Sequence, residues 1–272
     1  MITGDSLKKI VYYERGFMKI LKSIAVAFSM YSRIPMPHFT WASDDMKYHL
    51  IFFPWIGIVI GGIEYLWLFI CEKFGIERAA FGLIAVAIPL IVTGGFHVDG
   101  FMDTSDALSS WQDKEKRLEI LKDPHIGAFA VIRLLTAVLI LLAAIIMMDK
   151  KNFIFWIISF FTARILSGIS VVKFKNAKKD GLLNTESKTA NEKTVFICLI
   201  LELILAGAFM ICLSPAIAIC HFICMACLFV YYRWMSLDKF GGITGDLAGW
   251  FVTISEVVAA VAGVFLTIGG IN

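Results

Sequence analysis

Charged residues are scarce in this sequence. They make up 17% of the 272 residues, whereas hydrophobic residues make up 59%. A soluble domain usually carries about 25% charged residues, so this chain has too few charges to cover a water-facing surface. The charges that it has gather in short blocks between long apolar runs. This pattern excludes an ordinary soluble domain and predicts a chain that crosses a membrane several times.

The sequence also lacks a basic stripe, a signal peptide and a metal-binding cysteine pattern. Its net charge is only +3 and its basic residues lie between the apolar runs, so we expect no nucleic-acid partner. No apolar segment with a small-residue cleavage site follows the early lysines, so we expect no signal peptide. Cys220, Cys224 and Cys227 share one helix face beside His221. One helix cannot easily wrap three thiolates around an ion, so we interpret these cysteines as apolar filler.

Several apolar runs are each close to the roughly 20 residues that a helix needs to cross the hydrocarbon core. The predicted spans are residues 49–70, 79–96, 126–148, 152–172, 194–213, 215–234 and 247–269. Residues 17–31 carry apolar side chains on one side and lysines elsewhere, which predicts an amphipathic helix on the membrane surface; a short eighth span is the alternative. The predicted fold class is therefore all-α, a polytopic membrane protein with about seven transmembrane helices plus an N-terminal interfacial amphipathic helix.

Lysine and arginine counts predict the orientation of these spans. Nineteen basic residues flank the spans on the side of the N-terminus, whereas only Lys73, Arg78, Lys150 and Lys151 flank them on the other side. Because basic loops stay in the cytoplasm, we expect a cytoplasmic N-terminus and an external C-terminus. The predicted location is the inner (cell) membrane, with the lipid bilayer as a partner.

An acidic motif follows the second predicted span, with the sequence GGFHVDGFMDTSDA at residues 94–107. Its Asp99, Asp103 and Asp106 are spaced i, i+4 and i+7, so they share one face if the segment is helical. Adjacent carboxylates repel each other, and a divalent cation removes that repulsion. Oxygen ligands favour a hard ion such as Mg²⁺, which usually binds one or two carboxylates plus substrate phosphates. A solvated acidic face is the alternative interpretation.

A second motif, GGITGDLAG at residues 241–249, lies at the start of the last predicted span. Asp246 follows its glycine pair at the same spacing as Asp99 follows Gly94 and Gly95. Both motifs are expected on the cytoplasmic side, so we predict that Asp246 joins the other aspartates in one metal site. Glycines at these positions let the backbone approach a phosphate closely or let two helices pack tightly.

Other charged side chains accompany the aspartates on the expected cytoplasmic side. The segment at residues 122–127, with Lys122 and Asp123, precedes a predicted span whose N-terminus can favour an anion, and SRIPMP at residues 32–37 forms a rigid basic turn. Both segments are either phosphate contacts or plain helix punctuation. Ionisable residues also lie in the inner halves of spans: Arg133, Arg164, Glu202 and Glu256. They fit either a polar cavity that opens to the cytoplasm or ion pairs that hold the bundle together.

Four of these elements, in this order, resemble the cobalamin synthase family, the adenosylcobinamide-GDP ribazoletransferases. The matching stretches are SRIPMP at residues 32–37, FFPWIGIVIGG at 52–62, TGGFHVDGFMDTSDA at 93–107 and LKDPHIGAFA at 121–130, and GDLAG at 245–249 lies where the family has a similar stretch. The resemblance covers roughly residue 17 to the C-terminus. It implies an N-terminal extension at residues 1–16 and a single membrane-embedded transferase domain at residues 17–272. The stretch Asp123-Pro124-His125 departs from the family's more usual polar sequence, so Lys122, Asp123 and Gly127 carry over better than His125.

The resemblance implies the final assembly step of cobalamin (vitamin B12) biosynthesis. In this reaction the 3′-hydroxyl of α-ribazole, or of α-ribazole 5′-phosphate, attacks the phosphorus attached to cobinamide in adenosylcobinamide-GDP. GMP leaves, adenosylcobalamin or its 5′-phosphate forms, and Mg²⁺ is required. Both substrates are the expected partners, together with a second copy of the chain or other enzymes of the corrinoid pathway.

The candidate residues take three roles in such a reaction, because phosphoryl transfer depends on positioning and on neutralising charge. The predicted metal ligands are Asp99, Asp103, Asp106 and Asp246. The predicted catalytic residues are His97, Asp106, Lys122 and Asp123, with His97 and Asp106 as alternative general bases. The predicted substrate-binding residues are Arg33, Gly94, Gly95, Lys122, Arg164 and Gly245.

Two other functions compete with this interpretation. A CDP-alcohol phosphotransferase also uses aspartates and a metal, but its motif continues Asp-Gly with two residues and then Ala-Arg. Here Asp99-Gly100 is followed by Phe-Met-Asp-Thr, so that motif fails. A transporter would use the charges within the spans, but it ordinarily shows inverted repeats and interrupted helices near the midplane. The sequence offers only the repeated spacing of a glycine pair and an aspartate.

Overall fold

The computed structural model describes residues 4–37, 40, 42–178 and 180–271, without the side chains of residues 4–17 and 43. Its helices are α1 (Gly4–Tyr31), the 3₁₀ helix η1 (Ser43–Lys47), α2 (His49–Phe74), α3 (Arg78–Thr93), α4 (Phe96–Ser109), α5 (Lys114–Ile120), α6 (Ala128–Met147), α7 (Lys150–Lys173), α8 (Leu182–Thr189), α9 (Glu192–Leu213), α10 (Pro215–Phe240) and α11 (Gly245–Ile268). Within the described part, β-structure is limited to an isolated bridge between Asn176 and Ile243. The predicted all-α fold class is confirmed.

Six helices are long and apolar enough to cross a membrane: α2, α6, α7, α9, α10 and α11. A seventh span is present if α3 and α4 are counted together, which agrees with the predicted number. The predicted span at residues 79–96 corresponds to α3, but α3 ends at Thr93 and the chain bends by 98° between α3 and α4. The cause is the pair Gly94 and Gly95, which adopt left-handed φ angles of 69° and 81° and end α3. The acidic motif therefore lies on a separate helix that crosses the bundle at its own angle.

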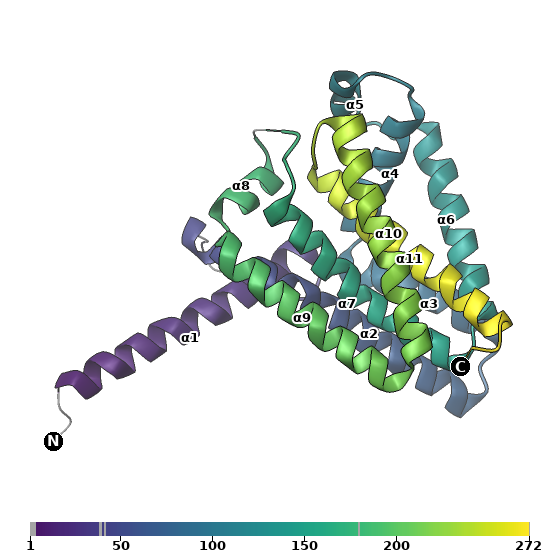
Figure 1. Cartoon of the computed structure of the whole chain (residues 1–272), viewed down its shortest axis with the longest axis horizontal. Helices are drawn as coiled ribbons and strands as arrows, with labels where there is room; N and C mark the ends of the chain where they lie inside the picture. The colour runs from purple at the N-terminus through teal and green to yellow at the C-terminus, as the bar shows by residue number, and fades with distance from the viewer. Residues whose placement is uncertain (1–3, 38–39, 41, 179, 272) are drawn as a thin grey trace.

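Helix α1 is longer than the sequence predicted, because it begins at Gly4 rather than near residue 17. It has 28 residues but is not among the candidate spans in the described part of the chain, and its interfacial position stays a prediction. Its C-terminal part packs into the body of the protein, where Val26 and Ala27 are fully buried. In Figure 1 its N-terminal part extends away from the other helices. The division at residue 16 falls inside this continuous helix and stays a prediction.

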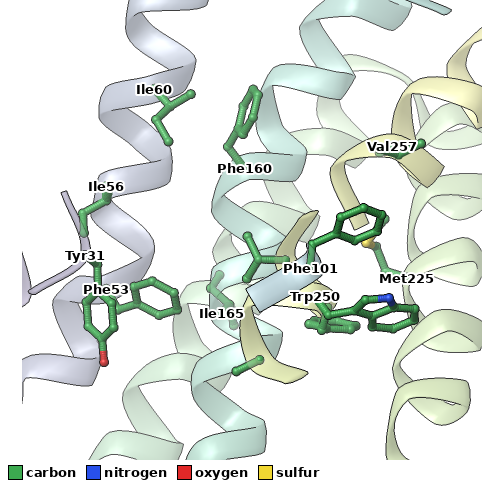
Figure 2. Close-up of a cluster of buried hydrophobic side chains, with 14 of the residues drawn as sticks. Tyr31, Phe53, Ile56, Ile60, Phe101, Phe160, Ile165, Met225, Trp250 and Val257 are labelled. Atoms are coloured by element: carbon green, nitrogen blue, oxygen red, sulfur yellow. The ribbon is translucent and has the colours of Figure 1, made fainter. Parts of the chain in front are cut away.

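The core of the protein forms around α7. In an apolar stretch of 18 residues, 72% of the residues of α7 are buried, compared with 22% for α9. Helix α2 packs closely against it, since a Cβ atom on Gly57 would lie 2.3 Å from the carbonyl oxygen of Phe160. Figure 2 shows the buried side chains that α2, α4, α7, α10 and α11 contribute to this core. Helix α9 instead exposes large apolar residues such as Ile204 and Leu205, which suits contact with lipid.

The loops gather at two ends of the bundle. At one end, Lys150 pairs with Glu72 at 2.7 Å, and Arg78 donates hydrogen bonds to the carbonyl oxygens of Ile146 and Met148. The four basic residues expected outside the cell lie at or beside this end. The other end carries η1, α5 and α8 (Figure 1). The basic residues are thus segregated between the two ends, and the orientation of these ends in the membrane stays a prediction.

Candidate functional site

Glycines at the crossing of α4 and α11 bring the two acidic motifs together. A Cβ atom on Gly100 would lie 2.6 Å from the carbonyl oxygen of Asp246 and 2.8 Å from its Cα atom. A Cβ atom on Gly249 would lie 2.9 Å from the carbonyl oxygen of His97. Only glycine fits so close a contact between two helix backbones. The crossing therefore places Asp246 against the helix that carries the other three aspartates.

All four aspartates predicted as metal ligands lie in one acidic cluster, formed by Asp99, Asp103, Asp106 and Asp246. The charges of the other three act on Asp103, as does the charge of Lys178. Asp99 is exposed and the other members are half-buried. The carboxylate of Asp246 also accepts a 3.3 Å hydrogen bond from the hydroxyl of Thr244, the residue that caps α11. Because like charges in this cluster repel each other, a bound cation stabilises it.

The acidic cluster does not form a closed cage for a metal. Among the residues that the structure describes, no three His, Cys, Asp or Glu side chains are arranged to hold an ion by themselves. The available donors are carboxylate oxygens, the ligand type that Mg²⁺ prefers, and Mg²⁺ commonly completes its shell with water and substrate phosphates. The donor chemistry therefore fits Mg²⁺ held jointly by the cluster and a phosphate ligand, and the identity of the ion stays a prediction.

A pocket of about 320 Å³ lies beside the acidic cluster, and Asp99, Gly245 and Asp246 line it. Aromatic side chains form part of its wall, including Tyr31, Phe53, Phe96 and His97. Its volume is near the lower end of the roughly 300–1,000 Å³ typical of small-molecule sites. The pocket thus combines a carboxylate region, suited to a metal and phosphates, with an aromatic region suited to a planar group.

His97 is the buried polar residue at the boundary of this pocket. Its side chain is 5% exposed, and its Nε2 atom has no hydrogen-bond partner among the described residues. The ring is held between aromatic neighbours, with centroid distances of 5.7 Å to Phe53 and 5.6 Å to Phe96. A fixed imidazole with an unused nitrogen can accept or donate a proton once a ligand enters.

Asp106, the alternative general base, is placed differently. A Cβ atom on Gly127 would lie 2.1 Å from the carboxylate of Asp106, so this carboxylate packs against the residue that caps α6. A negative charge is favourable there, at the N-terminus of a helix. Asp106 does not line the pocket, whereas His97 does. The geometry therefore favours His97 of the two candidates.

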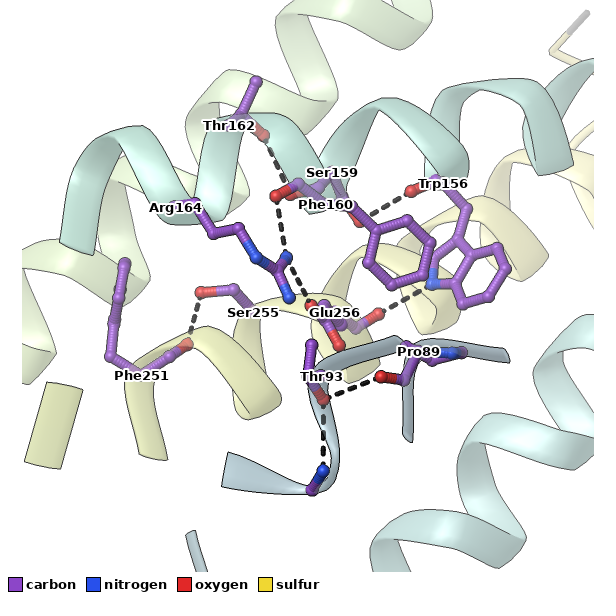
Figure 3. A network of polar contacts seen from close by, with 11 residues as sticks. Pro89, Thr93, Trp156, Ser159, Phe160, Thr162, Arg164, Phe251, Ser255 and Glu256 are labelled. Atoms are coloured by element: carbon purple, nitrogen blue, oxygen red, sulfur yellow. Dashed lines mark hydrogen bonds and ion pairs between the residues drawn. The ribbon is translucent and has the colours of Figure 1, made fainter. Parts of the chain in front are cut away.

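Arg164, predicted to bind substrate, forms a buried ion pair instead. It is 1% exposed, and its Nη1 atom donates a 2.9 Å hydrogen bond to Glu256 and a 2.8 Å bond to the carbonyl oxygen of Phe160 (Figure 3). It borders a second cavity of about 50 Å³, shared with His97, and not the pocket beside the acidic cluster. A charge inside a membrane span needs such a partner, which explains why Arg164 turns toward Glu256.

The predicted polar cavity of four charges within the spans is not formed as one site. Arg133 donates from its Nε atom to the hydroxyl of Ser109 at 3.2 Å. Glu202 accepts a 3.0 Å hydrogen bond from the indole nitrogen of Trp55. These contacts are separate from the ion pair of Arg164, so each of the charges has a local partner of its own.

Arg33, Gly94 and Gly95, which the sequence predicts as substrate-binding residues, lie next to one another. The backbone nitrogen of Arg33 donates to the carbonyl oxygen of Val92 at 2.8 Å, which ties the SRIPMP turn to the end of α3. A Cβ atom on Gly94 would lie 2.5 Å from the Nε atom of Arg33, so the arginine side chain lies across this glycine. The space above Gly95 is open. Arg33, Gly94 and Gly95 therefore form one exposed basic corner next to α4.

Lys122 and Asp123 lie in an exposed turn before α6. Asp123 accepts hydrogen bonds from the backbone nitrogen of His125 at 2.9 Å and from its ring at 2.6 Å. These bonds hold the pKa of Asp123 below its usual range. Their neighbour Leu121 lines the pocket, but Lys122 and Asp123 do not. Their catalytic roles stay predictions, and the structure shows them at a turn outside the pocket wall.

Comparison with known proteins identifies the family. The family model described as cobalamin-5-phosphate synthase matches residues 23–264. This chain belongs to the cobalamin-5-phosphate synthase family. The matched segment contains every candidate residue from Arg33 to Asp246. No solved structure matches the chain.

Relatives in several bacteria carry the name adenosylcobinamide-GDP ribazoletransferase. The relative in Lachnoclostridium phytofermentans is 40% identical over 245 residues, covering 90% of this chain and 94% of that protein. One in Clostridium perfringens is 30% identical over 244 residues, covering 88% of this chain and 96% of that protein. One in Caldanaerobacter subterraneus is 29% identical and is covered over its full length. The family resemblance deduced from the motifs is confirmed.

Sequence reasoning missed the segment between α7 and α9, which supplies much of the pocket wall. Lys178, Asp180 and Asn184 line the pocket from this segment, and so does Glu186 on α8. Glu186 is 3% exposed and accepts a 2.6 Å hydrogen bond from the hydroxyl of Tyr31. The lysines of this segment were used only to orient the spans. Their place on the same side as the acidic motifs was the one signal that pointed to the site.

Proposed function

We propose that this chain catalyses the final assembly step of cobalamin. It transfers the cobinamide-phosphate moiety of adenosylcobinamide-GDP to the 3′-hydroxyl of α-ribazole or its 5′-phosphate, and it releases GMP. Family membership and the names of the relatives support this reaction. The structural observation that carries it is the crossing of α4 and α11, because Gly100 and Gly249 let Asp246 join Asp99 and Asp103 beside one pocket.

The chemistry requires one bond to form and one to break at phosphorus. The ribazole oxygen forms a P–O bond, the P–O bond to the GMP phosphate breaks, and GMP leaves with the electron pair. The proton of the attacking hydroxyl needs an acceptor, and we assign this role to His97, which lines the pocket and whose Nε2 atom has no partner among the described residues. Arg33 does not line the pocket, but it provides a positive charge beside the glycine turn that would offset the charge of a phosphate there.

The acidic cluster is the proposed Mg²⁺ site. Asp99 and Asp246 line the pocket and their charges act on Asp103, so we assign the ion to these carboxylates together with the phosphates of the substrate. When bound, Mg²⁺ neutralises negative charge on the diphosphate and on the departing phosphate. The aspartates would hold the positive charge of the ion in place. They also require it, because without a cation they repel each other and the substrate.

The size of the pocket indicates which part of the substrate it takes. We propose that this pocket, with about 320 Å³ of space beside the acidic cluster, takes the nucleotide and its phosphates. We place the corrin ring at the open mouth of the pocket. We also place the pocket on the cytoplasmic side of the cell membrane, because the end of the bundle that holds it carries most of the basic residues.

The direct test uses the purified chain in lipid nanodiscs. Adenosylcobinamide-GDP, α-ribazole and Mg²⁺ are added, and the formation of GMP and adenosylcobalamin is followed by chromatography. We expect both products in equal amounts, and we expect EDTA to stop their formation. A well-folded sample that releases no GMP with either form of ribazole contradicts the proposed reaction.

A further inference from the structure

The loop after α7 is fastened to the segment that precedes α11. The backbone nitrogen of Ala177 donates to the carbonyl oxygen of Ile243 at 2.9 Å, and the nitrogen of Ile243 donates to the carbonyl oxygen of Lys175 at 2.8 Å. The two segments approach so closely that a Cβ atom on Gly242 would lie 2.4 Å from the carbonyl oxygen of Lys175. Two backbone hydrogen bonds and a close glycine contact fix the position of this loop relative to α11.

Lys178 directly follows this fastened stretch, and its placement is therefore set by the start of α11. It lines the pocket together with Asp99 and Asp246. Its positive charge acts on Asp103 and on Asp246, so the lysine lies within electrostatic range of the acidic cluster. A half-buried lysine at this place brings a flexible ammonium group to the same space in which the carboxylates gather.

We infer that Lys178 is a phosphate-binding residue of the pocket, and that its ammonium group contacts the diphosphate of the activated substrate. The identity of that ligand rests on the proposed function. A lysine is a common point-charge partner of phosphate. Negative charge on the GMP phosphate grows as its bond to the cobinamide phosphate breaks. A contact with Lys178 strengthens during that step, so it supports turnover as well as binding.

A purely structural lysine would behave differently. In that case Lys178 only offsets the repulsion within the acidic cluster, and its loss lowers the stability of the protein without a preference for phosphorylated ligands. Binding to phosphate predicts a selective effect on ligands that carry a diphosphate. Lys188 provides the matched control, because it is an exposed lysine on α8, in the same connection between α7 and α9, and does not line the pocket.

The experiment compares the intact wild-type chain in nanodiscs with Lys178→Met, Lys178→Arg and Lys188→Met. Binding of GDP and of guanosine is measured by calorimetry with Mg²⁺ present, and the thermal midpoint of each variant is recorded. We expect Lys178→Met to weaken GDP binding by about ten- to a hundredfold, the value of one charge-assisted contact. We expect guanosine binding and the thermal midpoint to be unchanged, Lys178→Arg to retain most of the affinity, and Lys188→Met to match the wild type.

Unchanged GDP binding in Lys178→Met, or an equal loss of GDP and guanosine binding, overturns the inference. If Lys178→Met does not fold, Lys178→Gln takes its place under the same criteria. Turnover of the wild type is measured in parallel as GMP release. A wild type that binds GDP through Lys178 but releases no GMP leaves the phosphate site standing and contradicts the proposed reaction, so the two failures are distinguishable.

Discussion

The contact between α4 and α11 leads to a quantitative prediction for Gly100→Ala. The added Cβ atom would lie 2.6 Å from the carbonyl oxygen of Asp246, whereas ordinary contact begins at 3.4 Å. The two backbones must therefore separate by about 0.8 Å. The neighbour is helix backbone and not the end of a flexible side chain, so the strain cannot be relieved by a rotamer change.

Two effects of different size follow from this separation. Inserting a methyl group into a packed interface lowers the free energy of unfolding by about 1–3 kcal/mol. A displacement of roughly 1 Å in the reacting groups reduces catalysis by about a hundredfold. Because the substitution moves Asp246 away from Asp99 and Asp103, we expect the loss of activity to exceed what the loss of folded protein explains. GMP release per folded molecule, with the folded fraction taken from gel filtration and thermal melting, measures this.

Two other glycines make the comparison a graded series. Gly249→Ala meets the carbonyl oxygen of His97 at 2.9 Å, so the required shift and the loss of activity are smaller. Gly62→Ala on α2 has nothing within 4 Å of the new atom. It should change the free energy of unfolding by no more than about 1 kcal/mol and leave the activity unchanged. The order of activity is therefore Gly62→Ala, then Gly249→Ala, then Gly100→Ala. If Gly100→Ala is as active as Gly62→Ala, the crossing does not position the site.

Three further predictions concern the metal, the buried ion pair and the orientation. Asp103→Asn should weaken Mn²⁺ binding, measured by calorimetry, and lower turnover, measured as GMP release, by orders of magnitude. Asp44→Asn, at an exposed position of η1, should change neither quantity. If the two variants have the same Mn²⁺ affinity and the same turnover, the metal site is contradicted. Arg164→Leu should lower the free energy of unfolding by about 3–5 kcal/mol, since it leaves Glu256 unpaired, and adding Glu256→Leu should restore much of that stability. A double variant that is no more stable than Arg164→Leu in thermal melting contradicts the stabilising role of the ion pair. A reporter fused after Asn272 should behave as exported, and cytoplasmic activity there would reverse the assigned orientation.

Local periodicity gave the face that the acidic residues share, on the condition that their segment is helical. The spacing of Asp99, Asp103 and Asp106 indicated one helical face, and α4 is helical over this range. The bend before it was not predicted, because the apolar run continues smoothly from α3 through Phe96. Glycine inside an apolar run is compatible with helix packing or with a break. Only the φ angles of Gly94 and Gly95 decide between the two.

Long-range partners were the part that the sequence could not supply. Arg164 was interpreted as a substrate contact, with an ion pair as the alternative, because nothing in its own span reveals that Glu256, on α11, lies 2.9 Å away. Lys178 was counted only as a positive charge that orients the chain. Its role depends on the two hydrogen bonds between its loop and Ile243, which no local pattern encodes. The convergence of Asp246 on α4 was predicted from the repeated glycine spacing, but the contact through Gly100 that produces it was not.

The crossing of α4 and α11 also determines when a newly made chain can become active. Helix α4 is synthesised well before α11, because residues 96–109 precede residues 245–268 in the chain. Until α11 and the segment before it are made, Gly100 has no backbone to pack against, the loop of Lys178 lacks its bridge to Ile243, and His97 lacks its contact with Gly249. An incompletely inserted chain therefore holds three of the four aspartates but no assembled site. The pocket beside the acidic cluster therefore requires both helices to be in place.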